Sequence, residues 1–263
     1  MDVKDLRCLV TGTASGIGDA VTRRLTAAGA SVVSLDRHKP EADVEQHVEV
    51  DLADPASIDS ALEQIDGSFD ALLNIAGIPG TAPAERVFAV NFLGMRHLTE
   101  SLFDRFNPRA SIVVVSSTAG FQWARRLDAL KEVVATESFA EGAEWFRTHP
   151  QEGNAYNFSK EAATVYTMAM GAAVREMGEL RINAVLPGPV ETPILADFEQ
   201  SMGKETLDGV KALLGRHATP DDIAPTIVFL ASRDSGWING TTLIADGGVS
   251  GAVFAGLVPA PEI

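Results

Sequence analysis

A tyrosine and a lysine stand four positions apart in the segment EGNAYNFSKE, at Tyr156 and Lys160. On a helix, positions i and i+4 share one face, so the ammonium group would lie beside the phenol. A positive charge close to a phenol favours its ionised form and lowers its pKa from about 10. Such a tyrosine could exchange a proton with a bound molecule as a general acid or base. Taken alone, the pair also fits an amphipathic surface helix, so the rest of the chain has to support the chemical interpretation.

A glycine-rich stretch near the N-terminus, TGTASGIG, separates an apolar run from a helical pattern. Gly12 allows a tight turn, Gly16 lets the backbone approach a ligand, and Gly18 allows the helix to pack closely on the strand. The N-terminus of a helix offers free N–H groups and a partial positive charge to a pyrophosphate. We therefore expect this stretch, including Ser15 and Ile17, to bind a dinucleotide, although three glycines can also form only a turn.

Asp36 closes the next apolar run, SVVSLD, and lies 18 residues after Gly18. A carboxylate there can accept hydrogen bonds from both ribose hydroxyls of an adenosine and would repel a 2′-phosphate, which favours NAD over NADP. Arg37 complicates this prediction because a guanidinium group can bind a 2′-phosphate; we expect it to stack on the adenine or to face the solvent. The alternative for Asp36 is a solvated carboxylate in a turn.

Short apolar runs alternate with longer helical patterns along the chain. The expected strands are 7–11, 31–36, 47–50, 69–74, 111–117, 181–187 and 241–246. The expected helices are 17–28, 55–65, 84–106, 155–177 and 221–231. Most of the strand runs are apolar throughout, which is typical of strands buried on both faces of a parallel sheet. The alternation predicts a single α/β domain with a doubly wound parallel sheet, the Rossmann fold.

Two segments interrupt this alternation. Residues 121–150 are long for a connection and have helical patterning, which predicts a helical insert rather than a loop. A second excursion, 193–215, follows the sixth strand and is expected to cover the substrate. Both would flank the carboxyl ends of the strands, where ligands bind in this architecture. Their apolar side chains, among them Phe121, Phe198 and Met202, either line a substrate site or build the insert's own core or a subunit contact.

Composition argues against several classes of partner and location. The 263 residues have a formal net charge of −15, which argues against nucleic acid and anionic membranes, because both require a basic surface. Cys8 is the one cysteine, so no intrachain disulfide can form and a reducing, cytoplasmic location is expected. No secretory signal is expected, and no stretch approaches the roughly 18 apolar residues of a membrane span.

With these motifs in order, the sequence resembles the short-chain dehydrogenase/reductase family over almost its whole length. The motifs are TGTASGIG, Asp36, Asp51-Leu52, NIAG at 74–77, Asn91, the serine of SSTAG, YNFSK at 156–160, PGPVET at 187–192 and DGG at 246–248. The resemblance implies an NAD-dependent enzyme, without a metal, that interconverts an alcohol and its carbonyl compound.

The resemblance also implies a catalytic tetrad. Tyr156 would exchange the substrate's proton while Lys160 lowers the pKa of the phenol and holds the nicotinamide ribose. Ser117 would bind the substrate oxygen, and Asn91 would hold a water that links the lysine to solvent. SSTAG contains two serines; the family spacing selects Ser117 and leaves Ser116 as the weaker candidate.

The remaining cofactor contacts follow from the same resemblance. Asp51 and Leu52 would contact the adenine. Asn74, Ala76 and Gly77 would lie along the cofactor ribose. The nicotinamide carboxamide would be held by Pro187, Gly188, Val190 and Thr192. Ile75 departs from the family's usual asparagine, at a position that is mainly structural in the family.

The 121–150 insert and the short segment after NIAG resemble bacterial 3α-hydroxysteroid dehydrogenase/carbonyl reductases and coniferyl-alcohol-type dehydrogenases. Apolar walls would suit a steroid, terpenoid or phenylpropanoid alcohol better than a sugar or hydroxy acid. In that subgroup the insert obstructs the family's usual contact through helices 84–106 and 155–177. We therefore expect a homodimer, rather than a tetramer, built mainly from 221–263. The alternatives are a catalytically silent dinucleotide-binding regulator and an isomerase or dehydratase on the same scaffold.

Overall fold

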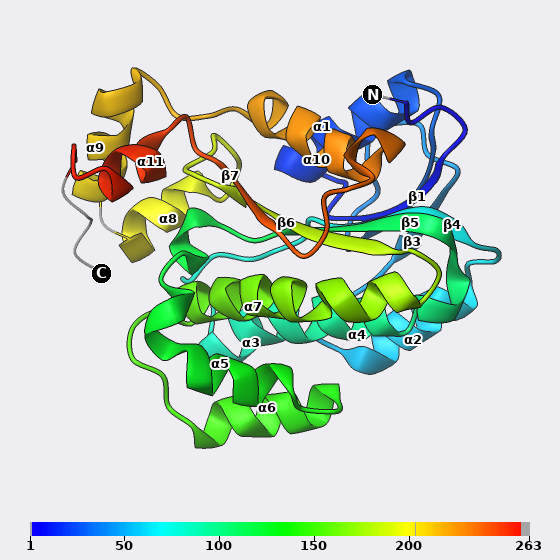
Figure 1. Cartoon of the computed structure of the whole chain (residues 1–263), viewed down its shortest axis with the longest axis horizontal. Coiled ribbons are helices and arrows are strands. Elements are labelled where there is room, and N and C mark those ends of the chain that lie inside the picture. Colours follow the sequence, from blue (N-terminus) through cyan, green and yellow to red (C-terminus); the bar gives the residue numbers. More distant parts are fainter. Residues whose placement is uncertain (1, 203, 259–263) are drawn as a thin grey trace.

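The computed structural model describes residues 2–202 and 204–258 of the chain. Seven strands form one parallel sheet in the order β3-β2-β1-β4-β5-β6-β7 (Figure 1). The strands are β1 Arg7–Thr11, β2 Ser31–Asp36, β3 Gln46–Glu49, β4 Phe69–Asn74, β5 Phe106–Val115, β6 Arg181–Pro187 and β7 Thr242–Ala245. The predicted single α/β domain with a doubly wound parallel sheet is therefore confirmed.

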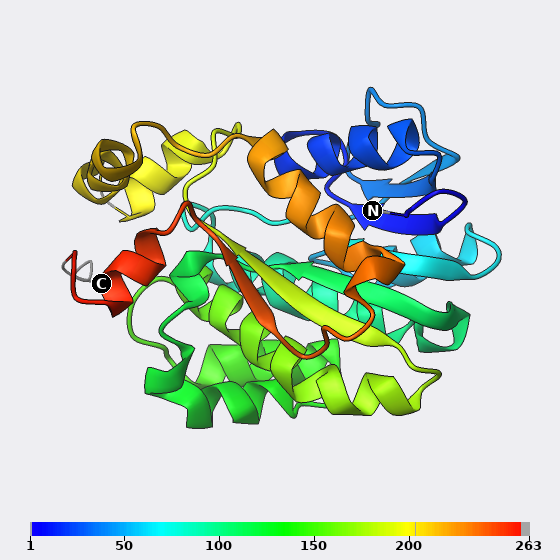
Figure 2. The ribbon, with the colours of Figure 1, turned by 45° about the horizontal axis from the view of Figure 1, so that its top comes forward.

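Helices cover both faces of this sheet (Figures 1 and 2). One face holds α1 Gly16–Ala27 and α10 Pro220–Ala231, and the other holds α2 Pro55–Glu63, α3 Ala84–Phe88, α4 Met95–Glu100 and α7 Ala155–Glu176. Successive residues of a strand enter opposite cores: Leu9 lies in the α7 core, whereas Cys8 and Val10 lie in the α1 core. This double burial explains why the strand sequences are apolar throughout. Among the described helices, none is long and apolar enough to cross a bilayer.

The 121–150 segment contains two helices, α5 Leu127–Val134 and α6 Phe139–Thr148, which lie outside α7 and α3 (Figure 1). Arg96 of α4 is 1% exposed and fixes the turn between them by donating to the carbonyls of Thr136 at 2.9 Å and Ser138 at 2.8 Å. Phe146 of α6 stacks on Phe88 of α3 with ring centres 4.3 Å apart. The aromatic residues of α6 therefore pack on the helical layer of the domain.

The helix expected over 84–106 is shorter and irregular. A π-helical turn, Ala89–Gly94, separates α3 from α4, and Phe106 already begins β5 by pairing with Phe69 of β4. The apolar pattern continued past the true end of the helix because Leu102, in the connection, is fully buried. A prediction from periodicity alone therefore made this helix too long, because it included the connection after α4 and the first residue of β5.

Three short helices gather beyond the carboxyl ends of β6 and β7 (Figures 1 and 2). They are α8 Leu195–Met202 and α9 Lys204–Leu214, from the excursion after β6, and α11 Val249–Phe254. The order of strands changes direction in the middle of the sheet, between β1 and β4, whose carboxyl ends point the same way as those of β6 and β7. A ligand crevice is expected at such a point in an open α/β sheet.

Candidate active site

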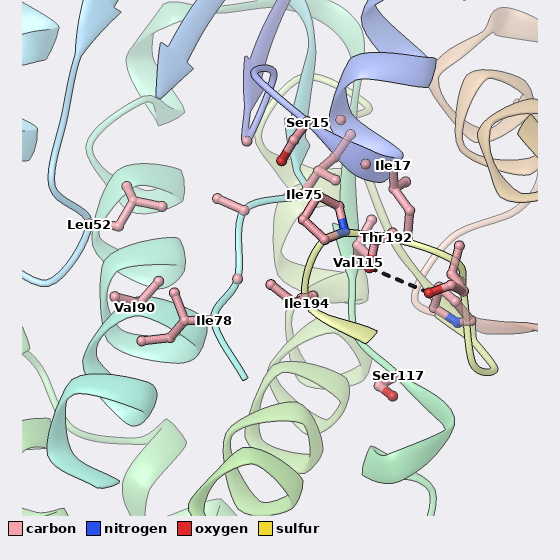
Figure 3. Close-up of a pocket in the computed structure, with 18 of the residues that line it drawn as sticks. Ser15, Ile17, Leu52, Ile75, Ile78, Val90, Val115, Ser117, Thr192 and Ile194 are labelled. Atoms are coloured by element: carbon pink, nitrogen blue, oxygen red, sulfur yellow. Dashed lines mark hydrogen bonds between the residues drawn. The ribbon is translucent and has the colours of Figure 1, made fainter. Parts of the chain in front are cut away.

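A cavity of about 460 Å³ opens at the carboxyl ends of the strands (Figure 3). The predicted residues that line it are Gly12, Ser15, Gly16, Ile17, Gly18, Asp36, Arg37, Asp51, Leu52, Ala76, Gly77, Ser117, Tyr156, Lys160, Pro187, Gly188, Val190 and Thr192. Of the predicted residues, Asn74 and Asn91 are not on this wall. Motifs that are far apart in the sequence thus share one cavity.

The glycine loop brings backbone close to the cavity. Gly12 has a φ of +75°, and a Cβ atom there would lie 2.9 Å from the Cα of Ala76. A side chain would therefore be strained and would clash. The Thr11 hydroxyl fixes the facing loop by accepting a hydrogen bond from the N–H of Ala76 at 3.0 Å. Helix α1 begins at Gly16 on the cavity wall, and Ser15 makes no side-chain capping bond, so N–H groups are available for an anion.

The segment after β6 lies against this loop. A Cβ atom on Gly16 would lie 3.1 Å from the Cγ2 of Thr192. The Thr192 hydroxyl donates to the carbonyl of Val190 at 3.4 Å, which fixes the side chain within the segment. Gly188 is equally confined, because a Cβ there would lie 3.0 Å from the Cβ of Asp246. The glycine loop and this segment therefore meet along one part of the cavity wall (Figure 3).

Asp36 is held in place by two backbone donors. Its Oδ2 accepts from the N–H of Ala14 at 2.9 Å, and its Oδ1 accepts from the N–H of His38 at 2.9 Å. Each oxygen keeps a second lone pair that a ribose hydroxyl could use. Arg37 and His38 line the same cavity as Asp36, and His38 was not predicted from the sequence.

Arg86 is a second cavity residue that the sequence did not reveal. Its Nη2 donates to Asp51 Oδ2 at 3.0 Å, while Asp51 Oδ1 accepts from the N–H of Ala53 at 2.9 Å. Burial raises the pKa of Asp51, but the hydrogen bonds from Ala53 and Arg86 outweigh it and hold the pKa below its ordinary value. A charged carboxylate is thus kept at the end of the cavity where the resemblance places the adenine.

Helix α7 begins directly before the tyrosine. Asn154 caps it, since its Oδ1 accepts from the N–H of Tyr156 at 2.7 Å. One turn later, Lys160 places its Nζ 5.7 Å from the centre of the Tyr156 ring, as the i, i+4 spacing predicts. The same Nζ donates to the carbonyl of Val115 at the end of β5, at 2.8 Å. The phenol and the ammonium group are therefore both fixed at the cavity wall.

Burial dominates the electrostatics of this pair. It raises the pKa of Tyr156 to about 12, against a hydrogen bond with Ser117 that lowers it. It also lowers the pKa of Lys160 to about 8. The expectation that Lys160 lowers the pKa of the phenol below about 10 is therefore wrong for this structure. Burial is the largest cause of the raised pKa of Tyr156, and the Lys160 ammonium group donates its hydrogen bond to the carbonyl of Val115.

The two serines of SSTAG have different environments. Ser116 is 3% exposed, and its hydroxyl donates to the carbonyl of Lys160 at 2.8 Å. Its hydroxyl also lies 2.9 Å from that of Thr164, so it joins β5 to α7. Ser117 lies one residue further, caps a short 3₁₀ turn and hydrogen-bonds Tyr156. The geometry therefore favours Ser117, as the family spacing did, for contact with a substrate oxygen.

Asn91 lies within the π-helical turn, and its amide holds the loop after β4. Its Oδ1 accepts from the N–H of Ile78 at 2.8 Å, and its Nδ2 donates to the carbonyl of Ile78 at 3.0 Å. Nδ2 also lies 3.2 Å from the hydroxyl of Ser159 on α7. Asn74 has a comparable supporting position, because its amide donates to the Thr99 hydroxyl of α4 at 2.9 Å. The side chains of both asparagines are thus used to join elements around the cavity.

The excursion after β6 contributes apolar wall through Ile194 and Leu207. The side chains of Phe198 and Met202 lie outside the described residues. None of the described residues at positions 121–150 lines the cavity. Phe121 instead packs on Phe254 of α11 with ring centres 4.4 Å apart. The apolar wall therefore comes from the excursion and from strands, helices and loops of the core.

Within the described part of the chain, no group of three or more His, Cys, Asp or Glu side chains could hold a metal ion. At one part of the wall, the phenol of Tyr156, the ammonium group of Lys160 and the hydroxyl of Ser117 face the same cavity as the glycine loop.

Comparison with known proteins agrees with these motifs. A family model described as enoyl-(acyl carrier protein) reductase matches residues 12–250. The coniferyl-alcohol dehydrogenase of Pseudomonas sp. (strain HR199 / DSM 7063) is 37% identical over 251 residues, covering 95% of this chain and 98% of that protein. The 3-alpha-hydroxysteroid dehydrogenase/carbonyl reductase of Comamonas testosteroni is 30% identical over 249 residues, covering 92% of this chain and 95% of that protein.

A solved structure supports the same assignment. The 3-alpha-hydroxysteroid dehydrogenase from Pseudomonas sp. B-0831, complexed with NADH, superposes with a TM-score of 0.79 at 31% identity. The match covers 96% of this chain and 99% of that one. The resemblance read from the motifs, including the coniferyl-alcohol and hydroxysteroid dehydrogenase subgroup, is confirmed by these relatives. The chain belongs to the short-chain dehydrogenase/reductase family.

Proposed function

We propose that this protein is an NAD-dependent oxidoreductase that interconverts an apolar cyclic or aromatic alcohol and its carbonyl compound. One observation supports this most directly: Tyr156, hydrogen-bonded to Ser117 and one turn from Lys160, opens on the same cavity as the glycine loop. A general acid or base and a dinucleotide-binding loop in one cavity are the two parts that hydride transfer to or from a carbonyl carbon requires.

The residues of the cavity fit NAD. The close approach at Gly12 and the start of α1 at Gly16 suit a pyrophosphate. The fixed carboxylate of Asp36 suits the adenosine ribose, and Asp51 suits the adenine amino group. The segment 187–192 would lie along the nicotinamide. When bound, NAD supplies the hydride acceptor, or NADH the hydride donor, for the substrate carbon.

Residues of the chain itself would transfer the proton to or from the substrate oxygen. In alcohol oxidation, the substrate hydroxyl gives its proton to the Tyr156 oxygen, while Ser117 holds the substrate oxygen by a hydrogen bond. In carbonyl reduction, the neutral phenol of Tyr156 donates its proton to the oxygen that becomes the alcohol. Because the phenol has a pKa of about 12, it is protonated at neutral pH and ready for the reductive direction.

The apolar cavity wall and the named relatives support the substrate class. Ile78, Ile194 and Leu207 line the cavity, and such a wall favours a hydrocarbon ring over a sugar. The relatives are named for coniferyl alcohol, which carries an aromatic ring, and for 3-alpha-hydroxysteroids, which carry fused rings, and both have extended apolar surface. A phenylpropanoid, steroid or terpenoid alcohol is therefore the substrate we propose.

A turnover screen tests this function. Purified protein with NAD should form NADH, seen by its absorbance, with at least one alcohol from a panel of phenylpropanoids, hydroxysteroids and terpenoids, and not with a sugar alcohol. Binding of NADH without turnover of any panel member or its ketone would indicate a silent regulator. Conversion of a panel compound without net change in NADH would indicate an isomerase or dehydratase.

A further inference from the structure

The 121–150 insert packs on the catalytic helix through α5 and the aromatic residues of α6, and one of its side chains, Arg126, adds polar contacts. Arg126 ends a 3₁₀ turn, Trp123–Arg126, directly before α5. Its Nε donates to Oε2 of Glu161, and its Nη1 donates to the carbonyl of Glu152 at 2.7 Å. Its guanidinium carbon also lies 5.1 Å from the centre of the Phe158 ring, within the range of a cation–π contact. One arginine from the insert therefore touches the 152–161 segment at three points.

These three points bracket the proposed proton-transfer residues. Glu152 lies four positions before Tyr156, and Glu161 directly follows Lys160. The contact with Glu152 fixes the chain that enters α7, whereas the contact with Glu161 fixes the second turn of the helix. A rotation or slide of this part of α7 would have to break at least one of these contacts.

The residues that lead from β5 to Arg126 also contact α7. Ser117 hydrogen-bonds Tyr156, and a Cβ atom on Gly120 would lie 2.7 Å from the carbonyl carbon of Lys160. The stretch 117–126 is therefore in contact with the catalytic helix at its start, middle and end. Arg126 is its last anchor and the only one of these that belongs to the insert.

The charge of Arg126 is matched to a buried partner. Glu161 is 2% exposed, and burial raises the pKa of its carboxyl group, while the Arg126 guanidinium acts in the opposite direction. A carboxylate so buried is costly without a partner, so this ion pair must stay closed for the helix to keep its place. The pair thus links the insert to the residue next to Lys160.

We infer that Arg126 is a positioning residue, which holds residues 152–161 so that the Tyr156 hydroxyl meets Ser117 and the substrate oxygen. This inference rests on the proposed function. It gives the insert a part in catalysis without any contact with the substrate. If so, the position of Tyr156 and Lys160 depends on the contacts of Arg126. A change at Arg126 should therefore slow the chemical step and leave the affinity for the cofactor unchanged.

The test compares Arg126→Met with Arg125→Met. Arg125 is the matched control, because its exposed side chain has no hydrogen-bond or ion-pair partner in the described chain. Arg126→Met should lower kcat about 10- to 100-fold, the range expected for a misplaced catalytic group. The Kd for NADH, measured by fluorescence, should change by less than about twofold, because no cofactor contact is removed. Arg126→Lys should recover part of kcat.

A double variant separates positioning from stability. Arg126→Met/Glu161→Gln removes the unpaired buried carboxylate, so the Tm should return toward that of the wild type, but kcat should stay low because the contacts with Glu152 and Phe158 are still missing. Wild-type kcat in either Arg126→Met variant would overturn the inference. Tyr156→Phe serves as the reference: if it stays active, the proposed function fails, whereas if it is inactive and Arg126→Met is not, only this inference fails.

Discussion

At the scale of single residues, burial has the largest effect on the pKa values of Tyr156 and Lys160, the proposed proton-transfer pair. Tyr156 and Lys160 have the spacing that the sequence predicted, yet the pKa of the phenol is raised and that of the ammonium group is lowered, both because water is excluded. A sequence gives types and spacing, but the degree of burial depends on every element that packs around the pair. The acid form of the phenol is therefore the one that this structure stabilises.

Removal of the phenol oxygen tests the role of Tyr156 directly. Tyr156→Phe keeps the ring that packs beside Lys160 but deletes the group that exchanges the proton. We expect kcat to fall by about 10²- to 10⁴-fold, the usual contribution of general acid–base catalysis, with the Kd for NADH unchanged. Retention of more than about a tenth of the wild-type kcat would show that another group transfers the proton.

The raised pKa predicts opposite pH behaviour for the two directions of reaction. A phenol with a pKa of about 12 is protonated at neutral pH, and its ionised fraction grows as the pH rises. Alcohol oxidation needs the ionised form, so its kcat/KM should increase between about pH 7 and about pH 10. Carbonyl reduction needs the neutral form and should not increase over the same range. Initial rates in both directions check this, and an oxidation rate independent of pH would contradict it.

Asp36 should decide between the two nicotinamide cofactors. Its carboxylate is fixed by the N–H groups of Ala14 and His38, so its charge stays at the ribose end of the cavity. Wild-type protein should prefer NAD over NADP, and Asp36→Asn, which removes the charge at nearly constant shape, should narrow the ratio of kcat/KM values. Equal kcat/KM values for NAD and NADP in the wild type would contradict this prediction, because they would mean that Arg37 outweighs the carboxylate. Arg37→Ala is the companion variant that tests this alternative.

At the scale of elements, the sequence predicted the regular parts of the fold well. The run 181–187 is β6 residue for residue, and the glycine loop joins β1 to α1 as expected. These elements follow from local causes, namely double burial of the strands and glycine at positions that exclude a side chain. Local causes can be read from one sequence, because the residues that produce them are neighbours in the chain.

Elements that depend on distant contacts could not be predicted in this way. The π-helical turn 89–94 accompanies the bonds from Asn91 to the backbone of Ile78, and the pairing of Arg86 with Asp51 joins α3 to the end of β3. Arg126 likewise finds its partner Glu161 across 35 positions of sequence. No period or motif indicates such pairs, and all three shape the candidate site. The sequence therefore predicted which motif residues line the cavity wall, with Asn74 and Asn91 as exceptions, but it did not indicate the long-range contacts around them.

At the scale of the whole molecule, the insert changes which surfaces are free. Helices α5 and α6 lie over the outer side of α7 and α3, the face that family members commonly use to associate (Figures 1 and 2). Strand β7 forms one edge of the sheet, and all its residues are partly exposed. An exposed edge strand beside apolar surface is a natural site for pairing with another copy.

We predict a homodimer built mainly from residues 221–263, of which the last five lie outside the described residues. The described part of this region presents large exposed apolar side chains, since Trp237 is 89% and Leu257 is 79% exposed. Burial of such side chains in a two-fold interface would be favourable.

Trp237→Lys should shift the protein toward monomer in light scattering at low concentration. Leu213→Lys, at a side chain 49% exposed outside this region, should leave the dimer intact. A wild-type monomer would exclude this assembly. A wild-type tetramer would show that α5 and α6 leave enough of α7 free for the family's helical contact.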